Sequence, residues 1–367
     1  MMTTKRLLDV CDFQGGTQPP KDEWINDPCE GYVRMLQIRD YSQGDAKFIQ
    51  YVKDTKKLHK CTKDDIMLSR YGYIGQAFIG LEGAYNVALV KVIKKAEIHT
   101  PYLLCYFQSY YFQHFLLSNV GARATIPGFN KDELENALIR IPEMCEQIEI
   151  ASKITKVDEL IGFHKQQLNV LDTLIKSRFI EMFGTLSCNE HHYPMCALKY
   201  ACRKITDGKH GGCEQEYNSG YYYVGAREIY DGEIHYGTAP QIVRGDFEKD
   251  YRRCNIEQGD FVLVNTGATI GKSAIAKHPL TERTLLQKSV AMFKVKTELI
   301  SAVFLKCCYD ANPEMYTVKS ASAQPNLLLS RINSTQIYLP PIELQRQFAA
   351  FVEQVDKSKF YIVQMQI

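Results

Sequence analysis

The chain has 367 residues, enough for two or three domains of ordinary size. Its hydrophobic share of 45%, its charged share of 23% and its formal net charge of +2 exclude a disordered, collagen-like or strongly charged chain. The sequence has neither an apolar stretch long enough for a transmembrane helix nor the apolar core of a signal peptide, so we expect a cytoplasmic protein without membrane contact.

A long, degenerate internal repeat organises the sequence. Its clearest part starts at Leu134 and recurs 198 positions later without a gap. The matched residues are Leu134, Ile139, Ile141, Pro142, Gln147, Val157 and Asp158 with Ile332, Ile337, Leu339, Pro340, Gln345, Val355 and Asp356. Upstream, 65–68 matches 260–263, and Leu7 and Cys11 match positions near Leu198 and Cys202. Each half is therefore predicted to be a globular unit followed by a helix.

The first globular unit, residues 1–142, contains short runs of β-branched and aromatic residues between Gly, Asp and Asn turns. Phe48–Val52 and Ala88–Ile93 are predicted strands, and one amphipathic helix is expected around Pro101–Leu117. A central helix is predicted at 143–184, where apolar residues alternate at spacings of three and four. At 1.5 Å per residue it would be about 60 Å long, too long to lie within one globular unit.

The second globular unit, residues 185–340, has predicted strands at Tyr221–Val224, Phe261–Val264 and Val290–Val295 and a predicted helix around Ser301–Tyr309. A shorter distal helix is expected at 341–367. The sequence thus predicts an α+β protein with two β-rich units in tandem pseudo-repeat, separated by long helices that form an intramolecular antiparallel coiled coil.

The seam of this coiled coil is expected to consist of the apolar residues that recur at helical spacing on the two helices. They are Ile154, Val157, Ile161, Leu168, Leu171, Ile175, Phe348, Val352, Val355 and Ile362. We expect the segment 154–161 to lie against 348–355. Because the distal helix is shorter, part of the central seam is expected to lack a partner, either as a binding surface or through truncation.

The segment Thr266–Ser273 is similar to a phosphate-binding P-loop because it follows an apolar strand and ends in Gly-Lys-Ser. Gly267 and Gly271 enclose three residues, however, where a P-loop has four. The matching segment 70–76 keeps the glycines and lacks the Lys-Ser pair. A β-hairpin held by two glycines explains both copies, and a nucleotide-binding enzyme that uses Lys272 and Ser273 is the alternative.

No other motif indicates an active site or a metal centre. Five possible zinc ligands, Cys188, His191, His192, Cys196 and Cys202, match no standard zinc spacing, and the 12 cysteines contain no C-x-x-C pair. The sequence also lacks a nuclease Glu-x-Lys, the Asn/Asp-Pro-Pro-Tyr/Phe motif of amino-methyltransferases, G-x-S-x-G and H-E-x-x-H. We therefore predict no catalytic residues, no bound metal and reduced cysteines.

Two pairs of matching loops favour a binding function, because they carry the side-chain types that read base edges in DNA. The candidate DNA-binding residues of the two hairpins are Arg70, Tyr71, Tyr73 and Gln76 in the first unit and Asn265, Thr266, Thr269 and Lys272 in the second. A later loop contributes Arg123 and Thr125 in the first unit and Lys319, Ser322 and Gln324 in the second. Exposed loops are often polar without any such role, so the paired positions carry more weight than any single residue.

Several segments resemble the specificity subunits of type I restriction-modification systems. The runs 157–161, 165–168 and 174–184 resemble their central spacer helix, and 339–345 with Phe348, Val355, Asp356 and Lys357 resembles the start of their distal spacer. The chain departs from the family pattern at 140–143, where Arg-Ile-Pro-Glu replaces a double proline, and in its short distal helix.

This resemblance covers nearly the whole chain and has clear functional implications. It implies a noncatalytic subunit for phage defence, with two target recognition domains that read a bipartite, asymmetric sequence in double-stranded DNA. It further implies two methyltransferase subunits and restriction subunits as partners, which would bind S-adenosylmethionine, ATP and Mg. A truncated or silent specificity allele that acts only as a scaffold is the remaining alternative.

Overall fold

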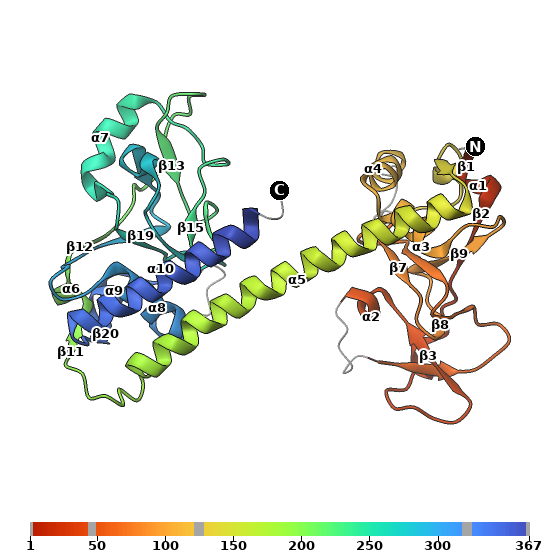
Figure 1. Ribbon diagram of the computed structural model, residues 1–367, viewed down its shortest axis with the longest axis horizontal. Helices are drawn as coiled ribbons and strands as arrows, with labels where there is room; N and C mark the ends of the chain where they lie inside the picture. The colour runs from red at the N-terminus through yellow and green to blue at the C-terminus, as the bar shows by residue number, and fades with distance from the viewer. Residues whose placement is uncertain (1–2, 43–48, 121–127, 318–324, 365–367) are drawn as a thin grey trace. The chain divides into compact units, whose positions relative to one another are not determined.

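The computed structural model describes residues 3–42, 49–120, 128–317 and 325–364. The chain divides into two compact units, 1–161 and 162–367, and the division falls within the long helix α5 (Met144–Phe183) (Figure 1). Within the described ranges, no helix is both long and apolar enough to cross a membrane.

The first unit is built on an antiparallel four-stranded sheet. In sheet order its strands are β2 (Cys11–Gly15), β9 (Leu89–Lys94), β6 (Ile66–Ser69) and β7 (Ala77–Ile79). Alternate residues of β6 point to opposite faces, as the period of a strand requires. Ile66 and Leu68 pack into one buried cluster with Phe107 and Phe112, whereas Met67 packs into another with Tyr85. Both faces of this sheet are therefore covered.

A second sheet and several short helices complete the first unit. The sheet contains β4 (Tyr51–Lys53), β3 (Tyr32–Leu36), β8 (Gly83–Tyr85) and β5 (Lys60–Cys61), and β3 pairs with β8 in parallel. The remaining elements are β1 (Thr3–Arg6), paired with β10 (Leu138–Ile141), and the helices α1 (Leu7–Val10), α2 (Ile38–Ser42), α3 (Thr100–Gln108) and α4 (Tyr110–Asn119).

The single helix predicted at Pro101–Leu117 is wrong, because the structure has two helices there, α3 and α4. Ser109 has extended backbone angles that end α3. Its Oγ accepts a hydrogen bond from the Phe112 N–H at 3.2 Å, which caps the start of α4. The apolar pattern continues across this break and therefore concealed it.

The second unit repeats this architecture with the same strand order. Its main sheet contains β12 (Cys202–Asp207), β19 (Val290–Val295), β16 (Phe261–Val264) and β17 (Ser273–Ile275). Smaller pairs are formed by β13 (Tyr222–Val224) with β18 (Thr284–Leu286), β14 (Ile229–Tyr230) with β15 (Glu233–Ile234), and β11 (Met195–Ala197) with β20 (Gln336–Tyr338). The helices are α6 (Leu198–Ala201), α7 (Arg244–Cys254), α8 (Ala302–Ala311), α9 (Leu329–Ser334) and α10 (Ile342–Gln364).

Equivalent elements of the two units begin at the positions that the repeat predicts. The short helices α1 and α6 begin at Leu7 and Leu198, and the strands β2 and β12 that follow them begin at Cys11 and Cys202. All four of these side chains are buried. The predicted tandem pseudo-repeat of mixed α and β structure is confirmed.

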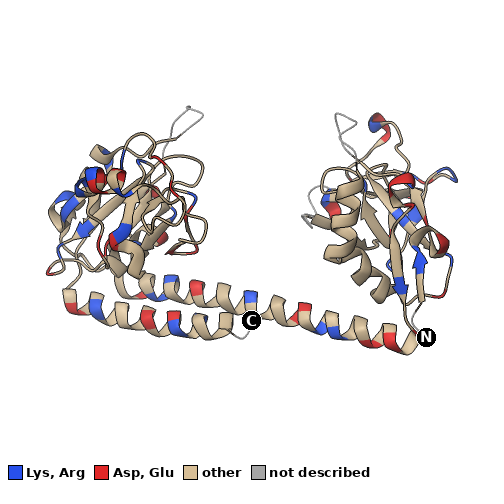
Figure 2. Ribbon diagram, turned by 90° about the horizontal axis from the view of Figure 1, so that it is seen from above, with Lys and Arg blue, Asp and Glu red and all other residues tan. Residues whose placement is uncertain are grey.

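Within the second unit, α10 lies beside the C-terminal part of α5 (Figures 1 and 2). The Phe348 ring lies 5.5 Å from the rings of Phe179 and Phe183, and Lys359, farther along α10, forms an ion pair with Asp172, farther back on α5. Successive contacts along α10 therefore meet earlier residues of α5, so the two helices are antiparallel.

The predicted register of the helix pair is wrong, because Phe348 packs against Phe179 and Phe183 and not against the segment 154–161. Phe179 and Phe183 belong to the hydrophobic core of the second unit, together with Phe348. The position at which each helix enters that core therefore sets the register. Among the other seam residues in this unit, Val355 is buried, Ile175 and Val352 pack against the core, and Leu168, Leu171 and Ile362 are half-buried.

The N-terminal part of α5 exposes apolar side chains. Ile154, Val157 and Ile161 are 38%, 54% and 39% exposed. The sequence predicted that part of the central seam would lack a partner within the chain, but the expected pairing of 154–161 with 348–355 placed that part toward the C-terminal end of the helix. The structure instead exposes these three N-terminal seam residues.

Candidate nucleic-acid interface

The hairpin β6–β7 of the first unit presents four of the candidate DNA-binding residues. The Gly75 N–H donates to the Ser69 carbonyl at 2.8 Å, and the Ser69 N–H donates to the Gln76 carbonyl at 2.9 Å. Gly72 and Gly75 have positive φ angles of 74° and 78°, which allow the tight turn. Tyr73, between them, is 79% exposed, and Gln76 is also exposed. Two backbone hydrogen bonds thus hold the turn, and the side chains of Tyr73 and Gln76 face solvent.

The hairpin β16–β17 of the second unit has the same hydrogen bonds. Here the Gly271 N–H donates to the Val264 carbonyl at 3.0 Å, and the Val264 N–H donates to the Lys272 carbonyl at 2.8 Å. These bonds make Gln76 and Lys272 structurally equivalent. The prediction of two glycine-held hairpins is confirmed.

This geometry rules out the alternative P-loop enzyme. A P-loop leads from a strand into the N-terminus of a helix, where backbone N–H groups bind phosphates. Lys272 is instead followed by the strand β17, which pairs antiparallel with β16. Ser273 lies in β17, is buried, and donates to Asp310 Oδ1 at 3.4 Å. Lys272 and Ser273 are therefore parts of a hairpin.

Each hairpin base is joined to a second segment of its unit. Tyr71 forms an isolated antiparallel bridge with Gly128, and Thr266 forms the corresponding bridge with Asn326. The Thr266 hydroxyl also donates to Asn326 Oδ1 at 3.0 Å. The other predicted loop residues, Arg123, Thr125, Lys319, Ser322 and Gln324, lie outside the described residues. Their DNA contacts remain predictions.

Arg70 and Asn265 occupy equivalent positions but have different surroundings. The Arg70 guanidinium donates from Nε to the Phe129 carbonyl at 3.1 Å and from a terminal nitrogen to Asn130, and it lies 5.3 Å from the centre of the Tyr71 ring. These contacts orient the group, and they use only some of its five N–H donors. Asn265 is buried, and its side-chain oxygen has no hydrogen-bond partner among the described residues.

Different elements cover the two hairpin tips. In the first unit, Gln113 of α4 donates to the Gly75 carbonyl at 2.7 Å, and a Cβ at Gly75 would lie 2.4 Å from Leu116. In the second unit, a Cβ at Gly271 would lie 2.3 Å from the ring of Tyr316. Both second glycines have positive φ angles, which favour glycine, and a side chain at either position would also displace its neighbour.

A neighbouring turn adds a charge that the sequence comparison missed. It connects β18 to β19 in the second unit, where Lys288 is exposed and the Ser289 carbonyl accepts a hydrogen bond from the Asn265 N–H at 3.0 Å. The equivalent turn of the first unit exposes Val87, and its Ala88 carbonyl accepts from the Arg70 N–H at 2.8 Å. The three polar residues 287–289 between two apolar strands were the signal in the sequence that could have identified this turn.

Other basic side chains of this unit contact acidic neighbours. Lys209 Nζ lies 2.6 Å from Asp250 Oδ2, and this hydrogen bond raises the pKa of Lys209 above its ordinary value. Arg253 and His210 both contact the Asp207 carboxylate. Along the described chain of each unit, basic and acidic residues are interspersed (Figure 2). Any nucleic-acid contact would therefore depend on a few placed side chains more than on a broad basic field.

Comparisons with known proteins agree with this architecture. The family described as the type I restriction modification DNA specificity domain matches residues 1–173 and 204–367. The MjaVIII specificity subunit of Methanocaldococcus jannaschii is 25% identical, over 96% of this chain and 85% of that protein. The MjaIX specificity subunit of the same organism is 21% identical, over 95% and 85%.

Two solved structures share the fold. The S subunit of a type I restriction-modification system from M. genitalium has a TM-score of 0.56 at 15% identity, over 100% of this chain and 92% of that chain. A chain from a study of complex assembly and conformational transition in a type I system has a TM-score of 0.55 at 15% identity, with the same coverage. Since the family match extends over both repeats, this chain belongs to the type I restriction-modification DNA specificity family and is a specificity subunit of such a system.

Proposed function

We propose that each unit is a target recognition domain that reads one half of a bipartite, asymmetric sequence in double-stranded DNA. The observation that carries this proposal is the pair of equivalent hairpins with different tips, in which Gln76 corresponds to Lys272 and Arg70 to Asn265. Two identical readers would favour a symmetric site. Two readers that share a scaffold and differ in their side chains favour two unlike half-sites.

The two tips have different chemistry for DNA. The first unit offers Arg70, Gln76 and the exposed Tyr73, which suit hydrogen bonds to guanine or adenine edges and apolar or stacking contacts. The second unit offers the exposed ammonium groups of Lys272 and Lys288, which suit phosphate oxygens as well as guanine. We infer that the second unit contributes more of the salt-dependent affinity.

Catalysis belongs, in this proposal, to partner subunits. Two methyltransferase subunits would bind S-adenosylmethionine and modify the target, and restriction subunits would bind ATP and Mg and cut unmodified DNA. Family membership supports this division of roles. The isolated chain is then expected to transfer no methyl group from S-adenosylmethionine to DNA, and transfer by the purified chain would refute this division.

The experiment that tests the proposal is to map methylated bases in a host that carries this chain with its methyltransferase subunits. A single split motif with two unlike halves is expected. Grafting residues 1–142 onto another specificity subunit should then move one half of that motif. A change in both halves, or a motif with two identical halves, would contradict separate reading by the two units.

A further inference from the structure

Each long helix carries a buried glutamine on its first turn. Gln147 of α5 is 2% exposed and Gln345 of α10 is 0% exposed, and the two are equivalent positions of the repeat. A buried amide must find partners for both its oxygen and its nitrogen, because an unpaired polar group is costly to bury. The partners of these two side chains show what the glutamines hold together.

In the first unit, Gln147 bridges two backbone segments. Its Oε1 accepts a hydrogen bond from the His99 N–H at 3.0 Å, and its Nε2 donates to the Pro142 carbonyl at 2.9 Å. His99 is the residue that precedes α3, and Pro142 lies between β10 and α5. One side chain therefore ties the start of a helix of the globular part to the start of the long helix.

In the second unit, Gln345 makes the same bridge. Its Oε1 accepts from the Ser301 N–H at 2.9 Å, and its Nε2 donates to the Pro340 carbonyl at 2.9 Å and to the Leu299 carbonyl at 3.0 Å. Ser301 precedes α8, and Pro340 lies between β20 and α10. The bridge thus recurs with equivalent partners, although the loops of the two units differ.

Glutamine satisfies this arrangement better than the side chains that are closest to it in size and shape. Glutamate has the same length but no N–H donor when it is ionised, and asparagine is one methylene shorter. Methionine fills the same space and leaves the backbone groups unpaired. The requirement for a donor and an acceptor at the end of the same side chain explains why glutamine occurs at both positions.

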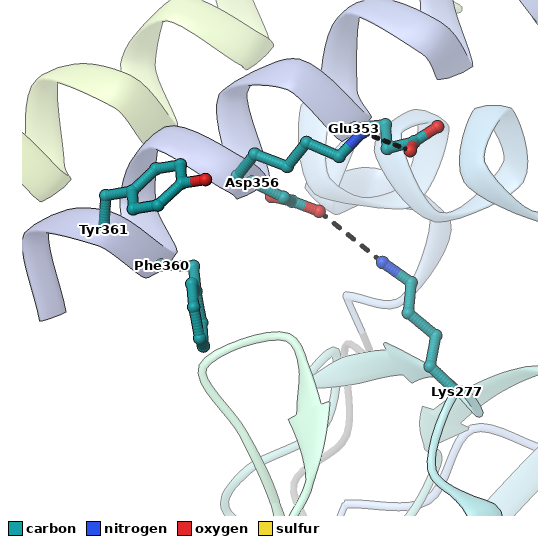
Figure 3. Close-up of a pocket in the computed structure, with 6 residues that line it drawn as sticks. Lys277, Glu353, Asp356, Phe360 and Tyr361 are labelled. Atoms are coloured by element: carbon teal, nitrogen blue, oxygen red, sulfur yellow. Dashed lines mark ion pairs between the residues drawn. The ribbon is translucent and has the colours of Figure 1, made fainter. Parts of the chain in front are cut away.

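The surface contacts between α10 and the rest of its unit are weaker. Lys277 Nζ lies 3.5 Å from Asp356 Oδ2 across a shallow hollow that Phe360 and Tyr361 also line (Figure 3). The Lys277 and Asp356 side chains are 68% and 41% exposed, and exposed ion pairs contribute little to stability. Gln345 is buried and makes three hydrogen bonds, so it is better suited than this ion pair to fix the angle of the helix.

We propose that Gln147 and Gln345 are positioning residues that fix the angle between each recognition domain and its long helix, and that they thereby restrict the half-site separation which the methyltransferase complex accepts. This inference rests on the proposed function. Replacement of either glutamine should leave the sequence of both half-sites unchanged, because the reading hairpins are not touched, and should relax the accepted gap.

The test uses the assembled methyltransferase complex and duplexes in which the two mapped half-sites are separated by the natural gap or by one base pair more or fewer. Gln147→Met and Gln345→Met are compared with Gln166→Met and Gln354→Met, which replace exposed glutamines of the same two helices. The readout is methylation at the altered gaps divided by methylation at the natural gap. We expect this ratio to rise about tenfold in the buried variants and to stay constant in the controls.

Gln147→Glu and Gln345→Glu keep the shape and the acceptor, so they test the same point if the methionine variants do not assemble. Equal loss of methylation at every gap would show that the glutamines contribute only stability, and it would overturn the positioning role while the proposed function stands. A wild-type complex that methylates all three gaps equally would also overturn it. If the wild-type complex gives no split motif, the proposed function itself fails, and the positioning role fails with it.

Discussion

The two units have the same scaffold and different surfaces. The strand orders β2-β9-β6-β7 and β12-β19-β16-β17 are equivalent, as are the hairpin hydrogen bonds and the buried glutamines. Gln76 and Val87 in one unit correspond to Lys272 and Lys288 in the other, and α4 covers one tip where Tyr316 covers the other. Backbone bonds and core packing therefore define the scaffold, while the tip side chains differ between the two units.

The two parts of α5 differ in a related way. Its C-terminal part contributes Phe179 and Phe183 to the core of the second unit, whereas its N-terminal part exposes Ile154, Val157 and Ile161. Apolar residues at the same helical spacing are thus buried in a core in the C-terminal part and exposed in the N-terminal part. Core substitutions and surface substitutions on this one helix should separate the two roles.

The largest expected effect is that of Phe183→Ala. Loss of a fully buried phenylalanine that contacts Phe304 and Phe348 should lower the free energy of unfolding by about 3 to 5 kcal/mol. Val157→Ala, at an exposed position of the same helix, should change it by less than about 0.5 kcal/mol. Urea denaturation of both variants measures the contrast, and similar losses would show that the N-terminal part of α5 is also covered.

The second prediction tests the shared scaffold through Gly16 and Gly208. A Cβ at Gly16 would lie 2.1 Å from the Asn86 carbonyl oxygen, and a Cβ at Gly208 would lie 2.1 Å from that of Leu286. Since backbone atoms cannot move aside easily, Gly16→Ala and Gly208→Ala should each cost about 3 kcal/mol of stability. Thermal or urea unfolding measures both. A large cost in one unit only would mean that the two scaffolds differ in rigidity.

The third prediction concerns the tips, where the units differ. Arg70→Ala should weaken DNA binding by about 1 to 3 kcal/mol and relax one position of the target if Arg70 contacts a base. Lys272→Ala should weaken binding to all sequences alike and lower the salt slope by roughly one if Lys272 contacts a phosphate. Binding of the assembled complex to target and unrelated duplexes at several salt concentrations distinguishes the two. Unchanged binding in both variants would remove the hairpins from the interface.

The sequence predicted most of the scaffold because backbone packing restricts residue type. The matches of Leu7 with Leu198 and Gln147 with Gln345 mark buried positions whose partners recur in both units. The register of the helix pair could not be predicted in this way, because a repeat aligns equivalent positions while antiparallel packing joins non-equivalent ones, such as Phe348 with Phe179. The comparison of the two halves missed Lys288 because its counterpart, Val87, is apolar, so the two turns show no similarity in sequence.

The fourth prediction uses a turn that both units share before the central strand of the sheet. The Asp65 carboxylate accepts hydrogen bonds from Lys91 at 2.9 Å and from the Thr62 N–H at 2.8 Å. Partial burial alone would raise the pKa of Asp65, but the hydrogen bonds from Lys91 and Thr62 outweigh it and hold the pKa below 3.8. Asp65→Asn should therefore lower stability by about 1 kcal/mol at neutral pH.

A depressed folded-state pKa gives stability that is present above the ordinary pKa and is lost as the pH falls through the folded value. The difference between wild type and Asp65→Asn should therefore shrink below about pH 4. Urea unfolding at neutral and acidic pH measures it. A difference that stays constant with pH would assign the effect to packing and not to the charge.

The smallest expected effect is that of the ion pair between Lys359 and Asp172, and it tests the antiparallel register directly. The two side chains are 23% and 67% exposed, so solvent and salt screen their attraction. A double-mutant cycle with Lys359→Met and Asp172→Asn should give a coupling of about 0.5 kcal/mol, because each single change removes the same contact. The pair Lys359→Asp with Asp172→Lys should recover part of the stability that each single reversal loses. High salt should reduce the coupling further.

Lys359 also lies 3.7 Å from Asp356 of its own helix, and that contact remains in the Asp172 variant, so the cycle isolates the contact between helices. A coupling of zero at low salt, together with no recovery in the charge-reversed pair, would mean that α10 and α5 do not meet at this level and that the register set by Phe348 ends before Lys359.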